Sequence, residues 1–303
     1  MSRGDAPPVG IVITVFRGGC EVAHQEHVVE LRLVGRHALR ELALAVGDEV
    51  TFDPDRGIVL ELMPRRTQLA RQRPRDDPRR EHVIAANMDV LAIVMSVAEP
   101  RFSPGFVDRF LLAAFAGGLE ALLAVNKIDL CHGEPLPAEI RGFEAVVPIC
   151  AVSAETGEGL EALRAHLVGT RTVLAGPSGV GKSSLLNALD PELRLETREV
   201  SARRRKGRHT TARAALLRLP GEAIVVDTPG VREVATGPIA PQFLDRVYPE
   251  IARVAPDCHF RDCRHDQEPE CAVRRAVESG DLPAPRHASY QKLVEEIRRQ
   301  SPR

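Results

Sequence analysis

The first part of the chain shows short runs rich in apolar residues, some of them alternating with polar ones, as in β-strands. Turn signals rich in glycine, aspartate and proline separate these runs. The pattern predicts strands at Val9–Phe16, Val28–Leu33, Glu49–Asp53 and Ile58–Leu62. Several short strands within so few residues favour a small β-barrel such as an OB-fold, with a generic small β domain as the alternative.

From His82 onward, continuous apolar runs alternate with segments of helical periodicity. The apolar runs predict buried strands at Asp89–Ser96, Leu122–Val125, Val146–Ile149, Arg171–Ala175 and Ala223–Val226. The segments between them predict helices at Gly105–Ala116, Glu158–Leu167 and Lys182–Leu189. Strands that alternate with helices indicate a parallel α/β sheet, and such sheets bind ligands beyond the carboxyl ends of their strands.

Two segments lack this regularity. Residues 65–80 are rich in arginine without apolar periodicity, so we expect an exposed basic linker that could contact phosphates. After about residue 240 the chain is rich in Pro, Cys and His, and it ends in a charged helix predicted at Pro285–Arg299. These changes predict a multidomain α/β protein with domains at 1–72, 73–238 and 239–303.

Composition limits the classes of function. The 303 residues carry a net charge of −1, so contact with nucleic acid would depend on local basic patches. Aromatic residues make up only 4%, which argues against a surface built on base stacking. The N-terminus lacks an apolar stretch of signal-peptide length, and the apolar region 110–125 is interrupted and too short for a membrane span. We therefore expect a cytoplasmic protein with no membrane partner.

A phosphate-binding loop follows the strand predicted at Arg171–Ala175. The segment from Gly176 to Ser183 fits G-x-x-x-x-G-K-[ST] at every fixed position, against the alternative of a chance glycine loop. Glycines let backbone N–H groups wrap around phosphate oxygens, and the following helix N-terminus adds partial positive charge. Lys182 would reach the β- and γ-phosphates, and Ser183 would bind Mg²⁺. The expected nucleotide contacts here are Gly176, Pro177, Ser178, Gly179, Val180, Gly181, Lys182, Ser183 and Ser184.

A second motif, Asn-Lys-Ile-Asp at 126–129, selects the base. The carboxylate of Asp129 can accept hydrogen bonds from N1–H and the exocyclic amine of guanine, a donor pair that adenine lacks. Asn126 would tie this loop to the rest of the site, and the stem of Lys127 can lie along the purine. Ser153-Ala154 resembles the companion loop whose backbone N–H meets the guanine O6.

The Mg²⁺ side of the site is predicted from Asp227-Thr228-Pro229-Gly230, which follows a predicted strand. Asp227 would hold Mg²⁺ through a water, and the N–H of Gly230 would sense the γ-phosphate. Thr210 or Thr211, in a basic segment between the phosphate loop and Asp227, could complete the Mg²⁺ shell, and the sequence leaves both open.

The attacking water lacks an obvious partner. Ras-like enzymes have a glutamine after the glycine that senses the γ-phosphate, whereas this chain has Val231, which cannot orient water. His209 is the candidate catalytic residue because imidazole can accept a hydrogen bond from water near neutral pH; a contact with a partner is the alternative. The base-selecting motif precedes the phosphate loop, the reverse of the familiar GTPase order, which indicates a circularly permuted GTPase domain.

Three cysteines and a histidine near the C-terminus have metal-ligand spacing. Cys258, Cys263, His265 and Cys271 form C-x4-C-x-H-x5-C, which suits tetrahedral Zn²⁺. Four protein ligands leave no open position, so we expect one structural zinc ion per chain. His259 competes for the histidine position but directly follows Cys258, and buried free cysteines are the remaining alternative.

In this order, the motifs resemble the bacterial ribosome-small-subunit-dependent GTPase A (RsgA) family over essentially the whole chain. The resemblance implies an N-terminal OB-fold-like β-barrel, a central circularly permuted P-loop GTPase domain and a C-terminal zinc-binding helical domain. It also implies a late assembly factor that binds the small ribosomal subunit and its rRNA, hydrolyses GTP to GDP and phosphate when the subunit stimulates it, and is then released. The family associates the histidine matching His209 with catalysis, and its zinc ligands match residue by residue.

Two other functions are weighed against this one. A GTP-gated rRNA-binding scaffold with little hydrolysis of its own is motivated by the missing glutamine. A P-loop kinase of small molecules is disfavoured by the guanine-selecting motif at 126–129. Nothing in the sequence suggests an obligate dimer, so we expect a monomer that binds GTP and GDP.

Overall fold

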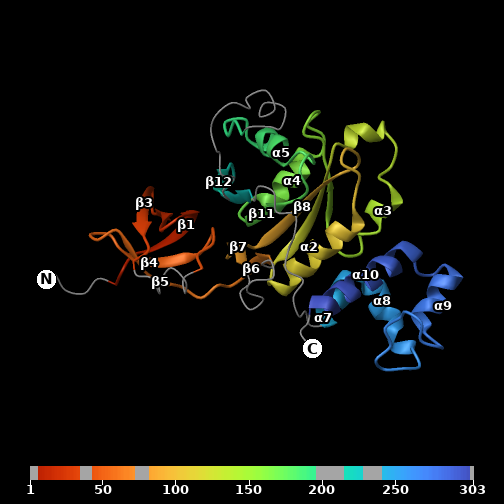
Figure 1. The fold of residues 1–303 in the computed structure, drawn as a ribbon. Coiled ribbons are helices and arrows are strands. Elements are labelled where there is room, and N and C mark those ends of the chain that lie inside the picture. Colours follow the sequence, from red (N-terminus) through yellow and green to blue (C-terminus); the bar gives the residue numbers. More distant parts are fainter. Residues whose placement is uncertain (1–5, 35–42, 72–81, 196–214, 228–240, 301–303) are drawn as a thin grey trace.

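The computed structural model describes residues 6–34, 43–71, 82–195, 215–227 and 241–300. Three bodies follow one another along the chain (Figure 1). A β-barrel is formed by the N-terminal strands, a central sheet is covered by helices, and a helical C-terminal part lies beside the central sheet on the side of α2 (Pro104–Ala116). Among the described residues, no helix is long and apolar enough to cross a membrane.

The N-terminal barrel has the strand order β1-β2-β3-β5-β4 and closes through pairing of β1 with β4. Its core holds Val12, Val22, Leu31, Val50 and Phe52, which alternate with outward-facing residues along the strands. This arrangement confirms the predicted OB-like barrel. Its strands are β1 (Val9–Phe16), β2 (Gly19–His24), β3 (His27–Arg32), β4 (Glu49–Asp53) and β5 (Ile58–Leu62).

One strand of the barrel was not predicted. The pair Gly18-Gly19 indicated a turn, but only Gly18 takes the left-handed turn conformation, with φ of +91°. Gly19 already belongs to β2 and pairs with Phe16 and Arg32. An added Cβ at Gly19 would lie 2.4 Å from the carbonyl oxygen of Leu31, so glycine is required here by close backbone approach as well as by the turn.

The prediction of an exposed linker over residues 65–80 is wrong at its N-terminal end. Strand β6 (Gln68–Arg71) pairs antiparallel with β7 (His82–Ala86). The guanidinium of Arg65 donates from Nε to the fully buried Asp48 of the barrel at 2.7 Å and from Nη2 at 2.8 Å. These contacts fix the segment that leaves β5 against the barrel, because bidentate pairing satisfies a carboxylate that burial would otherwise destabilise. Residues 72–81 lie outside the described part of the chain.

The central sheet has the strand order β10-β9-β8-β11-β13-β12. The first five strands in this order are parallel, and β12 runs antiparallel to β13 at one edge. Strands β8, β9 and β11 are buried almost along their whole length, which explains their continuous apolar sequences. The strands are β8 (Val90–Ser96), β9 (Glu120–Asn126), β10 (Ile149–Ala151), β11 (Arg171–Ala175), β12 (Ala215–Leu219) and β13 (Ala223–Asp227).

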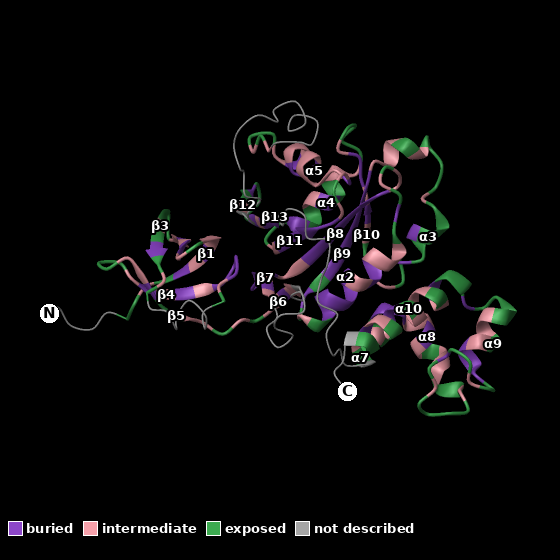
Figure 2. Ribbon diagram, viewed as in Figure 1, coloured by how far each residue is buried: buried purple, intermediate pink, exposed green. Residues whose placement is uncertain are grey.

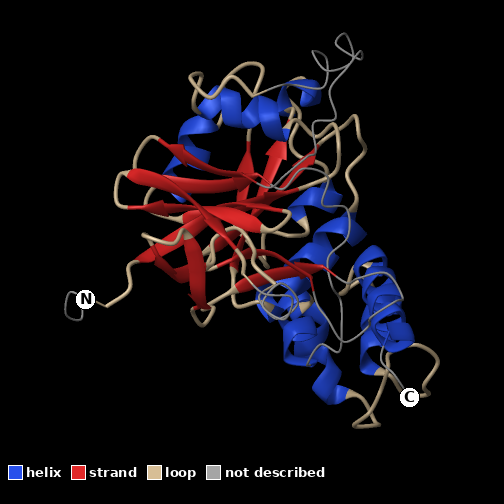
Figure 3. Ribbon diagram, turned by 60° about the vertical axis from the view of Figure 1, so that its left-hand side comes forward, coloured by secondary structure: helices blue, strands red, loops and turns tan. Residues whose placement is uncertain are grey.

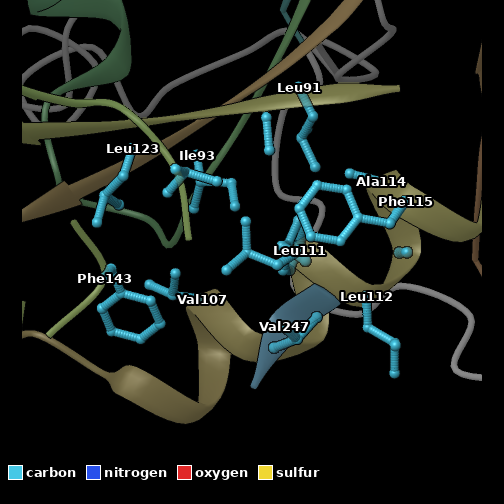
Figure 4. Close-up of a cluster of buried hydrophobic side chains, with 14 of the residues drawn as sticks. Leu91, Ile93, Val107, Leu111, Leu112, Ala114, Phe115, Leu123, Phe143 and Val247 are labelled. Atoms are coloured by element: carbon cyan, nitrogen blue, oxygen red, sulfur yellow. The ribbon is translucent and has the colours of Figure 1, made fainter. Parts of the chain in front are cut away.

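Helices cover both faces of this sheet, and the buried strands lie between them (Figures 2 and 3). Because side chains alternate along a strand, Leu91 and Ile93 of β8 face α2, whereas Ala92 and Val94 face α4 and α5. Figure 4 shows the first cluster, in which side chains of β8, β9 and α2 point toward one another. The covering helices are α3 (Ala138–Arg141), α4 (Leu160–Leu167) and α5 (Lys182–Leu189), together with α2.

The C-terminal part is helical, as the resemblance implied. The sequence pattern gave bounds only for the last helix, predicted at Pro285–Arg299, and it spans α10 (Ala284–Gln300). Residues of α7, α8 and α10, including Val247, Ile251 and Leu293, join the same hydrophobic cluster as α2. The C-terminal part is therefore attached to the central domain by a continuous core. Its other helices are α7 (Pro241–Val247), α8 (Pro249–Val254) and α9 (Ala272–Ser279).

Candidate nucleotide and metal sites

The predicted nucleotide-binding segments meet at the carboxyl edge of the central sheet. The phosphate loop leaves β11 after Ala175, and the base-selecting motif begins at Asn126, the last residue of β9. Strand β8 lies between these two strands and pairs with both. Asn126 and Val180, 54 residues apart in sequence, are thus brought to one edge, as expected for a ligand site of a parallel sheet.

Glycines allow the close approaches of the phosphate loop. Gly179 and Gly181 have φ of +92° and +94°, in the left-handed region that favours glycine. A Cβ added to Gly176 would lie 2.2 Å from the carbonyl oxygen of Val94, and one added to Gly181 would lie 2.4 Å from the amide nitrogen of Asn126. The loop can therefore follow its path only with glycine at these positions.

The phosphate loop ends at the N-terminus of α5, whose first residue is Lys182. The ammonium Nζ of Lys182 donates to the carbonyl oxygens of Gly176 at 2.7 Å and Pro177 at 3.2 Å, so the side chain folds back over the loop. Ser183 and Ser184 lie in the first turn of the helix. Backbone N–H groups of a first helical turn have no partner within the helix, which makes this end suited to bind anions.

Asn126 connects three segments of the site. Its side chain is 1% exposed, and its Nδ2 donates to the carbonyl oxygen of Val180 in the phosphate loop at 2.9 Å. Its Oδ1 accepts a hydrogen bond from the backbone N–H of Ala154 at 3.0 Å. One buried amide therefore fixes the phosphate loop and the Ser153-Ala154 loop relative to the base-selecting motif, the tying role that the sequence suggested for it.

The carboxylate of Asp129 is oriented by a hydroxyl group. Ser153 Oγ donates to Asp129 Oδ1 at 2.5 Å and accepts the backbone N–H of Thr156 at 3.1 Å. The contact leaves the second carboxylate oxygen of Asp129 without a hydrogen-bond partner among the described residues. Sequence reasoning expected Ser153-Ala154 to act through a backbone N–H, and it missed this use of the Ser153 side chain.

Lys127 has a partner that the sequence did not indicate. It takes a left-handed conformation with φ of +64°, and its Nζ donates to the backbone carbonyl of Glu99, in the loop between β8 and α2. Carbonyl groups are invisible to motif-based reasoning, because every residue has one. Only the path of the chain reveals this contact.

Part of the predicted Mg²⁺ side lies outside the described residues. This applies to the candidate catalytic residue His209, to Thr210 and Thr211, to Gly230 and to Val231. The backbone of Asp227 is the end of β13, and it pairs in register with Leu174 of β11. Asp227 thus follows the sheet to the same carboxyl edge as the phosphate loop.

The four predicted metal ligands lie together in the C-terminal part. The ligand atoms of Cys258, Cys263, His265 and Cys271 are all within 4.8 Å of one another. The predicted competitor His259 instead places its Nδ1 3.4 Å from a carboxylate oxygen of Glu270.

The distances within this cluster fit a tetrahedral metal. Cys258 Sγ lies 3.9 Å from Cys271 Sγ, and these two atoms lie 3.5 and 3.6 Å from Nδ1 of His265. A tetrahedron with Zn–S of about 2.3 Å and Zn–N of about 2.0 Å requires S···S and S···N separations of about 3.8 and 3.5 Å. Burial lowers the pKa of His265, which favours the neutral imidazole that a metal ligand must be.

Neighbouring elements hold this cluster in shape. Cys271 caps α9, and its Sγ accepts the backbone N–H of Arg274 at 3.5 Å. The carbonyl of His265 accepts hydrogen bonds from His287 Nε2 at 2.7 Å and Gln291 Nε2 at 2.9 Å, both on α10. His265 has φ of +61°, and these two bonds stabilise that unusual backbone conformation. The cluster can hold a metal ion that connects α9 to α10.

Comparison with known proteins agrees with the geometry. Residues 62–237 match the model of the family described as RsgA GTPase. A relative from Gemmatimonas aurantiaca named small ribosomal subunit biogenesis GTPase RsgA is 43% identical over 84% of this chain and 85% of its own length. A protein of the same name from Thermotoga neapolitana is 37% identical over 95% and 96% of the two chains.

Solved structures give the same result. The crystal structure of YjeQ from Thermotoga maritima superposes with a TM-score of 0.72 at 32% identity, covering 96% of this chain and 99% of that one. The crystal structure of YloQ, titled a circularly permuted GTPase, gives a TM-score of 0.68 at 28% identity over 98% and 97% of the chains. With its closed barrel, permuted central domain and Cys/His cluster, this chain belongs to the RsgA GTPase family.

Proposed function

We propose that this protein is a GTPase that hydrolyses GTP to GDP and phosphate and acts in the biogenesis of the small ribosomal subunit. The observation that carries the proposal is the buried Asn126 amide, which joins the phosphate loop to the Ser153-Ala154 loop at 2.9 and 3.0 Å. This connection holds the predicted base-binding and phosphate-binding segments in one site. Relatives along nearly the whole chain are named small ribosomal subunit biogenesis GTPases, which does not favour the scaffold alternative.

The roles of individual residues are part of this proposal. Asp129, oriented by Ser153, would accept the guanine donors, and Lys182 would neutralise the β- and γ-phosphates. Ser183, Asp227 and one of Thr210 and Thr211 would hold Mg²⁺, which bridges phosphate oxygens and stabilises the developing charge. Gly230 would sense the γ-phosphate, and His209 would position the attacking water.

The metal in the C-terminal cluster would be a single structural Zn²⁺ ion bound by Cys258, Cys263, His265 and Cys271. The donor set and the separations of about 3.5 to 3.9 Å support this choice. Zinc would stabilise the loop between α8 and α9, which contains few apolar residues.

Three domains, with bounds at 1–72, 73–238 and 239–303, would divide these tasks. The protein would be a cytoplasmic monomer, and its partner would be the small ribosomal subunit with its rRNA. The buried side chain of Asn87 donates from Nδ2 to the carbonyl oxygen of Gly47 at 3.0 Å, which supports a barrel held against the central domain, so both could present one surface to a large partner.

The nucleotide preference tests the enzymatic part of the proposal. Turnover of GTP and ATP by the full-length protein is measured with Mg²⁺, using Lys182→Ala as the inactive control. GTP turnover that disappears in the control supports the proposal. Equal or preferred turnover of ATP would contradict it and revive the kinase alternative.

A further inference from the structure

The loop between β8 and α2, residues 97–103, lies against the base-selecting motif. Three hydrogen bonds connect or shape these two segments. The backbone N–H of Val97 donates to the carbonyl of Asn126 at 3.1 Å, the hydroxyl of Ser96 donates to the carbonyl of Pro100 at 2.7 Å, and Nζ of Lys127 donates to the carbonyl of Glu99. None of these residues except Asn126 and Lys127 belongs to a known nucleotide-binding pattern in this sequence.

Ser96 sits where this loop leaves the sheet. It is the last residue of β8, pairs in register with Asn126 of β9, and is fully buried. A buried hydroxyl is stabilised only when it is hydrogen-bonded, and the carbonyl of Pro100 is the partner of this one. The hydroxyl of Ser96 therefore fixes the chain one residue beyond Glu99, and with it the direction of the Glu99 carbonyl.

Lys127 depends on that carbonyl for its position. A lysine side chain has several rotatable bonds, and an ammonium group without a fixed acceptor samples many rotamers. The contact with Glu99 is a charge-assisted hydrogen bond, which restricts the aliphatic stem of Lys127 to one direction. The stem is the part proposed to lie along the purine ring.

We infer that Ser96 is a positioning residue of the purine site, which acts through the Glu99 carbonyl on Lys127. This inference rests on the proposed guanine-nucleotide function and adds a residue to that site. Ser153 orients the carboxylate that reads the edge of guanine, whereas Ser96 orients the side chain that covers its face. The two serines therefore separate base selectivity from base stacking.

This separation predicts different responses to the base. Inosine diphosphate has no exocyclic amine, so part of the contact with Asp129 is missing, but its ring presents the same kind of face. Ser96→Ala should weaken GDP and inosine diphosphate equally, by roughly three- to tenfold, as expected for loss of one hydrogen bond that orders a binding group. Ser153→Ala should weaken GDP more than inosine diphosphate.

The experiment measures dissociation constants of GDP and inosine diphosphate for the full-length protein by isothermal titration calorimetry. Ser103→Ala is the matched control, because Ser103 lies in the same loop, is exposed and makes no side-chain cap hydrogen bond. It should leave both constants unchanged. In Lys127→Met, Ser96→Ala should cause no further loss, because the residue through which it acts is gone.

Two results would overturn the inference. One is equal affinity, within twofold, of Ser96→Ala and wild type; the other is a Ser96→Ala loss that adds fully to that of Lys127→Met. If Ser96→Ala folds poorly, Ser96→Cys replaces it, because a thiol has nearly the shape of the hydroxyl but is a weak hydrogen-bond donor. Ser96→Cys must then also weaken the binding of both nucleotides. Failure of the wild type to bind GDP would instead contradict the proposed function itself.

Discussion

A buried arginine attaches the C-terminal part to the central domain, and its removal gives the strongest stability prediction. Arg286 of α10 is 8% exposed and donates to Asp108 of α2 at 2.8 Å, to Glu250 of α8 at 2.6 Å and to the carbonyl of Val247 at 2.6 Å. Asp108 is 1% exposed, and it also accepts a hydrogen bond from the hydroxyl of Ser289.

Arg286→Met keeps much of the aliphatic volume and removes the charge. Asp108 then loses its positively charged partner, and an unpaired buried charge of this kind destabilises by about 3–5 kcal/mol. The two aromatic rings beneath the guanidinium, Phe143 and Tyr248, lie 4.9 and 4.5 Å from its central carbon and lose a cation–π contact as well. We expect the cost to fall on the attachment of α10.

Amide hydrogen exchange measures this cost, because a chain of three bodies does not unfold in one transition. Protection of α8 and α10 should fall by at least about a hundredfold in Arg286→Met, as about 3 kcal/mol or more requires. Arg299→Met is the control: its pair with Glu295 is exposed and contributes little. A change of less than about threefold in Arg286→Met would refute the reasoning.

The pH dependence provides a second check on the same variant. Burial raises the pKa of Asp108, and Arg286 opposes that effect, so the pKa rises further in Arg286→Met. A carboxyl whose pKa is raised on folding contributes stability at low pH and loses it as the pH rises through the folded-state value. The loss of protection in Arg286→Met should therefore become smaller as the pH falls. Adding Asp108→Asn to Arg286→Met should restore part of the lost protection at neutral pH.

Three further predictions follow from the sites. Gly181→Ala should weaken GDP binding by at least tenfold in calorimetry, because its φ is +94° and the new Cβ would lie 2.4 Å from the Asn126 amide; wild-type affinity would contradict the requirement for glycine at this position. Cys263→Ser should lose metal in elemental analysis and lower the protection of α9, while a folded wild type without bound metal would exclude the zinc proposal. His209→Ala should reduce GTP turnover and leave GTP affinity nearly unchanged; unaltered turnover would remove His209 from the mechanism.

The sequence predicted best where the signal is local. The strand Arg171–Ala175 and the helix Lys182–Leu189 have the predicted bounds, because an apolar run, a glycine loop and a helical period follow one another directly. The metal cluster was equally visible, since three thiolates and an imidazole leave few alternatives. Local chemistry determines these features, so sequence alone is sufficient.

Features that depend on distant partners were missed. Strand β6 forms from a basic segment because β7 supplies the pairing. The strand predicted at Val146–Ile149 begins only at Ile149, as β10, and Val147 is buried in the core before the strand starts. Arg286 gave no signal, because its carboxylate partners lie 36 and 178 residues away. The support of Lys127 by a backbone carbonyl was hidden for the same reason.

The central claim is that this protein hydrolyses GTP in the biogenesis of the small ribosomal subunit. Stimulation of its GTP turnover by that subunit tests this claim most directly. GTP turnover by the full-length protein is measured with and without purified bacterial small ribosomal subunits, with subunits alone and Lys182→Ala plus subunits as controls. The account predicts acceleration of at least about tenfold, the effect of about 1.4 kcal/mol of additional transition-state stabilisation. An identical rate with and without subunits would contradict it.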